Sequence, residues 1–204
     1  MYVAPHFRPR SSAEAMAIVR AHPFGLLVSQ QDGRPIASHT PMLPDGDDHL
    51  IGHVARANPQ WRGLEGQEVL AVFSGPHAHV TPTWYKAAPA VPTWDYVAAH
   101  VYGRAELVED AAGAADILRR LTAEFEGESW RFDDQPERFL ATMIKGLVAF
   151  RLRITQVEAS FKLSQNRSAA DRAGVIEGLR DRDLPGDAAI SDLIEVRERE
   201  KQGA

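Results

Sequence analysis

Residues 24–43 read FGLLVSQQDGRPIASHTPML, and this stretch decides the fold class. The apolar run 24–29 has the length and composition of a buried strand. The pair Asp32-Gly33 follows it, and this dipeptide favours the tight turn of a β-hairpin. Residues 35–43 then return as the partner strand. The sequence therefore starts its sheet with two antiparallel neighbours.

More strands follow outward from this hairpin, and most of the helices come late. We expect strands at 49–54, 69–73, 94–108 and 147–157, with a break at Gly75-Pro76 and an interruption near Gly103. Helices are expected at 12–21 behind a Ser11/Glu14 capping box, after Asn58-Pro59, and at 110–127, 136–145, 171–179 and 187–199. This order differs from the strand–helix alternation of a parallel doubly wound sheet. It predicts a mainly β protein of the α+β class, a small antiparallel barrel with peripheral helices.

Composition excludes several classes of function. The chain has no cysteine, which rules out disulfides, cysteine–zinc sites and thiol nucleophiles. No secretory signal is visible at the N-terminus, and no apolar stretch approaches the roughly 20 residues of a membrane span, so we expect a cytoplasmic protein. A formal net charge of −5 does not favour binding to nucleic acid. A local basic patch on a dimer would still allow DNA binding.

Metal and nucleophile motifs are weak. His49 and His53 have the spacing of a helical zinc site, but in a strand four residues span about 13 Å, too far to share one ion. His77 and His79 lie on a common strand face and could chelate, but no carboxylate neighbours them closely. We therefore predict no metal site. The chain also lacks a Gly-x-Ser-x-Gly elbow and phosphate-binding glycine loops, so the catalytic residues, and whether the protein is an enzyme, stay open.

Three segments are candidates for binding a ligand. At 53–59 a strand ends in a histidine and Arg56, and a helix N-terminus follows, which suits an anion; alternatively, Arg56 is solvated and His53 packs on Trp61. At 162–167 the sequence KLSQNR concentrates polar groups at strand spacing. These groups form either one wall of a pocket for a polar ligand or the end of a strand before a capped helix. Trp84 and Trp94 belong to aromatic clusters that line planar-ligand pockets, dimer interfaces or ordinary core.

Taken in order, several motifs resemble one family. They are HVARANPQW at 53–61, FSGP at 73–76, PTWY at 82–85, VPTWDY at 91–96 and KLSQNR at 162–167 before Asp171-Arg172. The chain resembles PaiB-type proteins of the FMN-binding split-barrel superfamily, which includes relatives of pyridoxamine-phosphate oxidase. Two positions depart from the family's pattern. Asp95 stands where asparagine is expected, and His79 stands where tyrosine is usual.

The resemblance implies an antiparallel split β-barrel of FMN-binding type, in a bacterial homodimer with one FMN at each end of the subunit interface. It divides the chain into a barrel domain at 1–165 and a C-terminal helical extension at 166–204. The cofactor-binding residues implied for the phosphate and ring are Ser38, His39, Thr40, His53, Ala55, Arg56, Asn58, Lys162, Ser164 and Gln165, with aromatic residues of the partner, for which Trp84 and Trp94 are the candidates, closing the pocket.

Three functions are consistent with this resemblance. The first is a flavin-binding negative transcriptional regulator or redox sensor. The second is a flavin-dependent oxidoreductase that uses FMN and a nicotinamide nucleotide. The third is a haem-binding or haem-degrading relative, for which His77 and His79 are the only sequence support.

Overall fold

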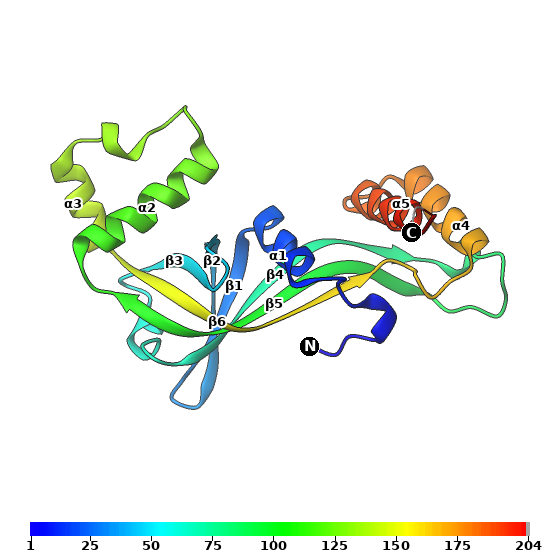
Figure 1. Cartoon of the computed structure of the whole chain (residues 1–204), viewed down its shortest axis with the longest axis horizontal. Helices are drawn as coiled ribbons and strands as arrows, with labels where there is room; N and C mark the ends of the chain where they lie inside the picture. The colour runs from blue at the N-terminus through cyan, green and yellow to red at the C-terminus, as the bar shows by residue number, and fades with distance from the viewer. Residues whose placement is uncertain (203–204) are drawn as a thin grey trace. The chain divides into compact units, whose positions relative to one another are not determined.

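A computed structural model of the chain describes residues 1–202, with the side chains of residues 1–200. Its strands close a barrel in the order β1-β2-β3-β6-β5-β4 (Figure 1). The predicted antiparallel barrel with peripheral helices is therefore confirmed.

The strands are β1 (Phe24–Gln31), β2 (Arg34–Asp45), β3 (His49–Ala55), β4 (Glu68–Val80), β5 (Thr93–Val108) and β6 (Leu147–Lys162). The helices are α1 (Ser12–Ala21), α2 (Ala111–Glu126), α3 (Glu137–Lys145), α4 (Ala169–Arg182) and α5 (Asp187–Gln202), with short 3₁₀ turns η1 (Pro5–Phe7), η2 (Pro59–Gly63), η3 (Pro82–Trp84) and η4 (Phe132–Asp134).

The hairpin of β1 and β2 forms as the sequence predicts. Its antiparallel register runs from Phe24 opposite Pro41 to Gln31 opposite Arg34. The two turn residues, Asp32 and Gly33, have φ values of 51° and 74°. A type I′ turn requires positive φ at both positions, and aspartate followed by glycine meets this requirement at low steric cost.

Three strands are longer or more continuous than expected. β4 continues through Gly75-Pro76 to Val80, whereas a break was predicted. Its pairing with β1 covers only Leu70–Val72, so Pro76 removes no hydrogen bond to β1. β6 runs to Lys162 rather than ending at 157.

β5 is uninterrupted at Gly103, against the prediction. A Cβ added there would lie 2.6 Å from the carbonyl oxygen of Arg153 and 2.7 Å from the Leu152 side chain. The glycine allows close packing of β5 on β6 instead of marking a break.

Helix starts depend on side-chain caps. The Glu14 amide donates to Ser11 Oγ over 3.2 Å, as the capping box predicts, but the Glu14 carboxylate accepts from the Arg10 amide. α4 begins at Ala169, two residues earlier than expected, because Ser168 caps it by accepting from the Asp171 amide at 3.1 Å.

The chain divides into two compact units, each discontinuous in sequence. One contains residues 19–73 and 100–158, and the other contains residues 1–18, 74–99 and those from 159 onward. The predicted boundary at residue 165 stays a prediction. Within the described residues, no helix has the length and apolar character needed to cross a membrane.

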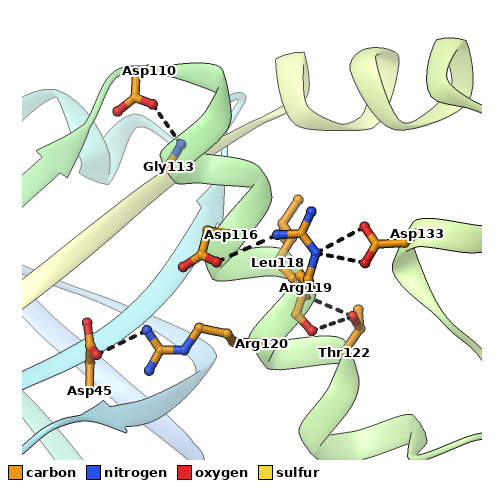
Figure 2. A network of polar contacts seen from close by, with 9 residues as sticks. All are labelled: Asp45, Asp110, Gly113, Asp116, Leu118, Arg119, Arg120, Thr122 and Asp133. Carbon is orange, nitrogen blue, oxygen red and sulfur yellow. Dashed lines mark hydrogen bonds and ion pairs between the residues drawn. The ribbon is translucent and has the colours of Figure 1, made fainter.

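In the first of these units, α2 covers one side of the barrel strands. Its buried residues Ala114, Ile117 and Leu121 pack against Leu43, Ile51 and Ala149, which come from β2, β3 and β6. Polar residues of α2 beside this apolar face form a network with neighbouring elements (Figure 2). Arg119 Nε contacts both carboxylate oxygens of Asp133 at 3.0 Å, and Arg120 reaches Asp45 at 3.0 Å. These contacts hold α2 against η4 and against the end of β2.

The second unit combines the segments 74–80, 93–99 and 159–162 of β4, β5 and β6 with the helical pair α4 and α5, which lie side by side (Figure 1). Val175, Leu179, Ile190 and Ile194 are fully buried. They face one another at helical spacing and form the apolar seam of the helical pair.

Candidate functional site

A group of polar side chains gathers where β2 and β3 lie side by side in the barrel unit. We call it the β2–β3 polar cluster; it comprises the side chains of Ser38, Thr40 and Asn58 with the His53 carbonyl, and Arg56 lies in the same loop as Asn58. Asn58 Nδ2 donates to Ser38 Oγ over 2.7 Å. Thr40 Oγ1 donates to the carbonyl oxygen of His53 over 2.6 Å. These residues come from two strands and the loop that follows, so the structure brings together side chains up to 20 positions apart.

His53 has a free ring nitrogen beside this cluster but on the other face of the sheet. The β2–β3 register continues from Met42 opposite Gly52 to Pro41 opposite His53, so the His53 ring shares the face of Pro41 and His39 rather than that of Ser38 and Thr40. Its Nδ1 is buried and has no hydrogen-bond partner among the described residues. Burial lowers the pKa of His53, so the imidazole is neutral at pH 7. A neutral imidazole can donate from one nitrogen and accept at the other, and a buried nitrogen without a partner is costly unless a ligand or water meets it.

Arg56 is partly engaged inside the chain. Its Nε donates to the Lys145 carbonyl over 2.8 Å, and its Nη2 donates to the Leu147 carbonyl over 2.9 Å. The guanidinium carbon also lies 5.7 Å from the centre of the Trp61 ring. The side chain is nonetheless exposed, and it has further N–H groups for an anion.

The helix N-terminus expected to supply free amides is not available as predicted. η2 is a single five-residue 3₁₀ turn, and Pro59 at its start has no N–H. The next amide, that of Gln60, already donates to Asn58 Oδ1 over 3.0 Å. Any anion at this cluster is therefore held by side chains rather than by a helix dipole.

Two residues predicted for this site stand apart from the cluster. His39 is exposed and stacks on Phe24, with ring centres 5.9 Å apart. Successive strand residues point to opposite faces, so His39 cannot share the face of Ser38 and Thr40. Ala55 has no polar side chain, and its carbonyl oxygen accepts from the Asn58 amide at 2.9 Å.

The polar segment at 162–165 lies in the other unit and is committed to internal contacts. Lys162 Nζ donates to Thr93 Oγ1 over 2.7 Å and also to the Trp94 carbonyl, and it lies 3.4 Å from Asp95 Oδ1. Ser164 Oγ donates to Asp95 Oδ2 over 2.6 Å. Asp95 is fully buried, and burial raises the pKa of its carboxyl above the ordinary aspartate value.

Gln165 completes this internal bonding. Its Oε1 accepts from the Leu163 amide at 2.7 Å, and its Nε2 donates to the Phe161 carbonyl. Within the described chain, this density of polar groups organises a strand end before a capped helix, which the sequence also allows. The role of Lys162, Ser164 and Gln165 in cofactor binding stays a prediction. In the sequence, Asp95, the residue at the centre, departs from the family's asparagine.

The two tryptophans proposed for the ligand pocket have different surroundings. Trp84 lies against α4, where Gly178 leaves room for its ring, and the Arg182 guanidinium is 4.9 Å from the ring centre. Trp94 is 54% exposed, with the rings of His77 and His79 beside it. An open groove of about 530 Å³ runs past Trp84; it is lined by Thr83, Trp84, Lys86, Gly174, Glu177, Gly178, Asp181 and Arg182.

Comparison with known proteins places this geometry in a family. Residues 1–156 match a family model described as "Putative FMN-binding domain". The chain belongs to this FMN-binding family. Its cofactor is therefore FMN, and the predicted resemblance to PaiB-type proteins is confirmed.

Two curated relatives of this FMN-binding chain extend over most of its length. "Protease synthase and sporulation protein PAI 2" of Bacillus subtilis is 34% identical over 201 residues, covering 96% of this chain and 97% of that protein. An uncharacterised protein of Aspergillus fumigatus is 31% identical, covering 78% of this chain and 83% of its own. The similarity includes the C-terminal residues beyond the matched domain.

Solved structures support the split-barrel fold of the family member. The flavocytochrome Anf3 of Azotobacter vinelandii aligns with a TM-score of 0.65 at 20% identity, covering 84% of this chain and 78% of its own. An FAD- and haem-binding protein of Mycobacterium smegmatis aligns with a TM-score of 0.62 at 18% identity, covering 88% and 82%. At such identities the likeness concerns the fold alone.

Proposed function

We propose that this chain acts as an FMN-binding homodimer with a regulatory output, as a negative regulator of gene expression or a sensor of the flavin's redox state. The observation that carries the proposal is the 34% identity to the Bacillus subtilis protein over 96% of this chain. That relative is named for protease synthase and sporulation, and the resemblance to PaiB-type proteins implies the negative regulator. The match covers both the flavin-binding domain and the C-terminal helices.

The FMN phosphate is assigned to the β2–β3 polar cluster. Ser38 and Asn58 bring hydroxyl and amide groups together, and Arg56 adds an exposed guanidinium from the same loop as Asn58. The unpartnered ring nitrogen of His53 lies on the other face of the sheet. A phosphate dianion accepts several hydrogen bonds and is held best by such charge-assisted donors. The donor set therefore fits the phosphate, and the internal bonds of Arg56 fix its orientation before the ligand arrives.

The dimer is assigned to the outer face of the barrel strands β1 and β4. Leu26 pairs with Val72 and Val28 pairs with Leu70, so four aliphatic side chains form two adjacent cross-strand pairs. They lie on the face opposite to the buried residues, and none of them is fully buried. Phe24 extends this apolar face and is 66% exposed.

An apolar sheet face of this kind is covered in soluble assemblies, and a second copy of the same face is self-complementary. We therefore place the two-fold interface here. FMN at the end of that interface, as the family resemblance implies, is part of the same proposal.

Direct reading of DNA by the C-terminal helices is disfavoured. The arginines of α4 and α5 are each near a carboxylate; the ion pairs are Arg172–Glu198, Arg180–Glu195, Arg182–Asp187, Arg197–Glu14 and Arg199–Glu195. Neutralised arginines contribute little to phosphate binding, and the whole chain is acidic. Regulation then depends on the flavin or on a protein partner rather than on DNA contacts of this helical pair.

The test begins with the absorption spectrum of the purified protein and a titration of the apoprotein with FMN. Sedimentation of the wild type and of Val28→Glu then tests the dimer face, with the exposed substitution Asp47→Glu as the control. We expect a flavin spectrum, a wild-type dimer and a Val28→Glu monomer. A dimer that survives Val28→Glu unchanged would contradict the interface assignment, while the flavin titration tests the cofactor site separately.

Activity assays separate the regulatory proposal from the alternatives. Sustained oxidation of a nicotinamide nucleotide by the FMN-loaded protein would favour an oxidoreductase and overturn the regulatory proposal. A Soret band in the purified protein would favour haem binding. A shift of promoter DNA that persists at physiological salt would show that the regulatory output includes DNA after all.

A further inference from the structure

Two histidines lie next to an exposed tryptophan on the β4 and β5 segments of the second unit. His77 and His79 are two positions apart in β4, where the buried residues between and after them are Ala78 and Val80. Because strand residues alternate between faces, both imidazoles project from the outer face. The ring centre of His77 lies 5.9 Å from that of Trp94, and the ring centre of His79 lies 5.6 Å from it.

The ring nitrogens of His77 and His79 make no other interaction in the part of the chain that the structure describes. No hydrogen bond or ion pair involves the ring nitrogens of His77 or His79 there, and both rings have access to solvent. By contrast, the surface ring of His49 is paired with Asp48 at 2.9 Å. His77 and His79 therefore keep their nitrogen lone pairs available for a ligand.

We propose that His77 and His79 form a two-histidine site for a late first-row divalent metal ion, with the indole of Trp94 beside it. Neutral imidazole is a good ligand for Ni(II), Cu(II) and Zn(II). Residues i and i+2 of a strand are roughly 6.7 Å apart along the chain, so imidazoles that rotate toward each other can reach a common ion at about 2.0–2.1 Å from each nitrogen. Water completes the coordination.

The surrounding charges allow a cation at this place. The ammonium group of Lys162 is engaged elsewhere, because it donates to the Trp94 carbonyl and lies 3.4 Å from the buried carboxyl of Asp95. The indole face adds a favourable electrostatic contact for a cation. The described residues hold no cluster of three or more metal-ligating side chains, so this is an open, two-ligand site.

His79 is half-buried on this strand, and tyrosine keeps an aromatic ring there. The substitution His79→Tyr is therefore a matched test that the fold should tolerate. Removing a residue that merely supports a metal ligand weakens affinity by about 10–100-fold, and loss of one of two direct ligands should weaken it at least tenfold.

The experiment uses the full chain without an added histidine tag, freed of metal by a chelator and titrated with Ni(II). We expect one saturable calorimetric site per chain and partial quenching of tryptophan fluorescence. An excess of Zn(II) should displace Ni(II) and restore the emission. Trp94→Phe should abolish the metal-dependent quenching and keep the calorimetric binding.

Two variants decide the outcome. His79→Tyr should lose at least about tenfold in Ni(II) affinity with unchanged thermal unfolding, whereas His22→Gln, a histidine outside the pair, should bind as the wild type does. Absence of saturable binding, or equal affinity in the wild type and His79→Tyr, would overturn the proposal. Equal weakening by His22→Gln would also overturn it, because the binding would then be nonspecific.

Discussion

The Ser164 hydroxyl donates a 2.6 Å hydrogen bond to the fully buried carboxylate of Asp95. This contact joins β5 to the connection between β6 and α4, across 69 positions of sequence. Lys162 approaches the same carboxylate from the end of β6. A buried charge is tolerated only with such partners, so Asp95 organises the polar segment that the sequence alone suggests as a binding wall.

Asp95→Asn tests the role of this buried charge through its pH dependence. Burial raises the pKa of Asp95 in the folded state above the unfolded value of about 3.9. The native state therefore binds this proton more tightly, and the contribution of Asp95 to stability falls as pH rises through that window. We expect the free energy of unfolding of Asp95→Asn, relative to the wild type, to increase from pH 4 to pH 7 in urea titrations.

The exposed substitution Asp47→Asn serves as the control, and its effect should be independent of pH by comparison. A difference between Asp95→Asn and the wild type that stays constant over the same range would show that the carboxyl is not perturbed. Asparagine keeps an acceptor for Ser164, so the variant should fold.

Asp187→Asn should destabilise the helical pair. Asp187 is 1% exposed and receives two hydrogen bonds from Arg182, at 2.8 and 2.6 Å, and a third from the Leu184 amide. Loss of one partner from a largely buried pair should lower the free energy of unfolding by about 2–3 kcal/mol at pH 7.

The pH dependence of this loss has the opposite sign from that of Asp95. The hydrogen bonds from Arg182 lower the pKa of Asp187, so its stabilisation is present above the ordinary carboxyl pKa and is lost as pH falls through the lowered value. The cost of Asp187→Asn should therefore shrink in acid. Asp181→Asn, an exposed carboxylate on α4, is the control, and an equal loss in both variants would argue against the buried pair.

Gly178→Ala tests the contact between α4 and Trp84. A Cβ at this position would lie 2.3 Å from two atoms of the indole ring. Alanine improves helix propensity by about 1 kcal/mol over glycine, whereas overpacking costs about 1–3 kcal/mol. We expect net destabilisation and a changed near-ultraviolet circular dichroism signal. A stabilised variant would mean that the ring moves aside freely; Glu177→Ala on the same helix controls for propensity.

Arg56→Ala should weaken FMN binding by about 10–100-fold, the equivalent of one charge-assisted hydrogen-bond donor worth roughly 1.5–3 kcal/mol. Because Arg56 also bonds the Lys145 and Leu147 carbonyls, the stability of the apoprotein must be measured beside the flavin titration. Ser38→Ala, which removes a single hydroxyl of the same cluster, should weaken FMN binding less. Unchanged affinity in both variants would sink the phosphate assignment.

Local signals in the sequence predicted the regular elements well where a short motif specifies the backbone. Asp32-Gly33 fixes a turn through the φ values it permits, and the Ser11 cap fixes the start of α1. Gly103 was misjudged because a glycine that relieves strand packing looks, in sequence, like one that breaks a strand.

The candidate site was less predictable than the fold. Ser38 and Asn58 were linked only through the family resemblance, and the register of β2 with β3 places the His39 and His53 side chains on the other face of the sheet. For Lys162, Ser164 and Gln165, residue type indicated hydrogen bonding but not its partners. Those partners lie in the distant segment around Asp95 or in the backbone nearby.

By itself, the sequence determined the antiparallel barrel, the family and the flavin, because turn chemistry, strand periodicity and a series of motifs are local properties of the chain. Only the tertiary structure decided which polar groups face one another. Asp95 is satisfied by Ser164 and Lys162, whereas His53 Nδ1 is buried without a partner in the described chain. The physical reason is that burial and hydrogen-bond pairing depend on contacts between distant segments, and the free energy of a polar group depends on those contacts more than on its residue type.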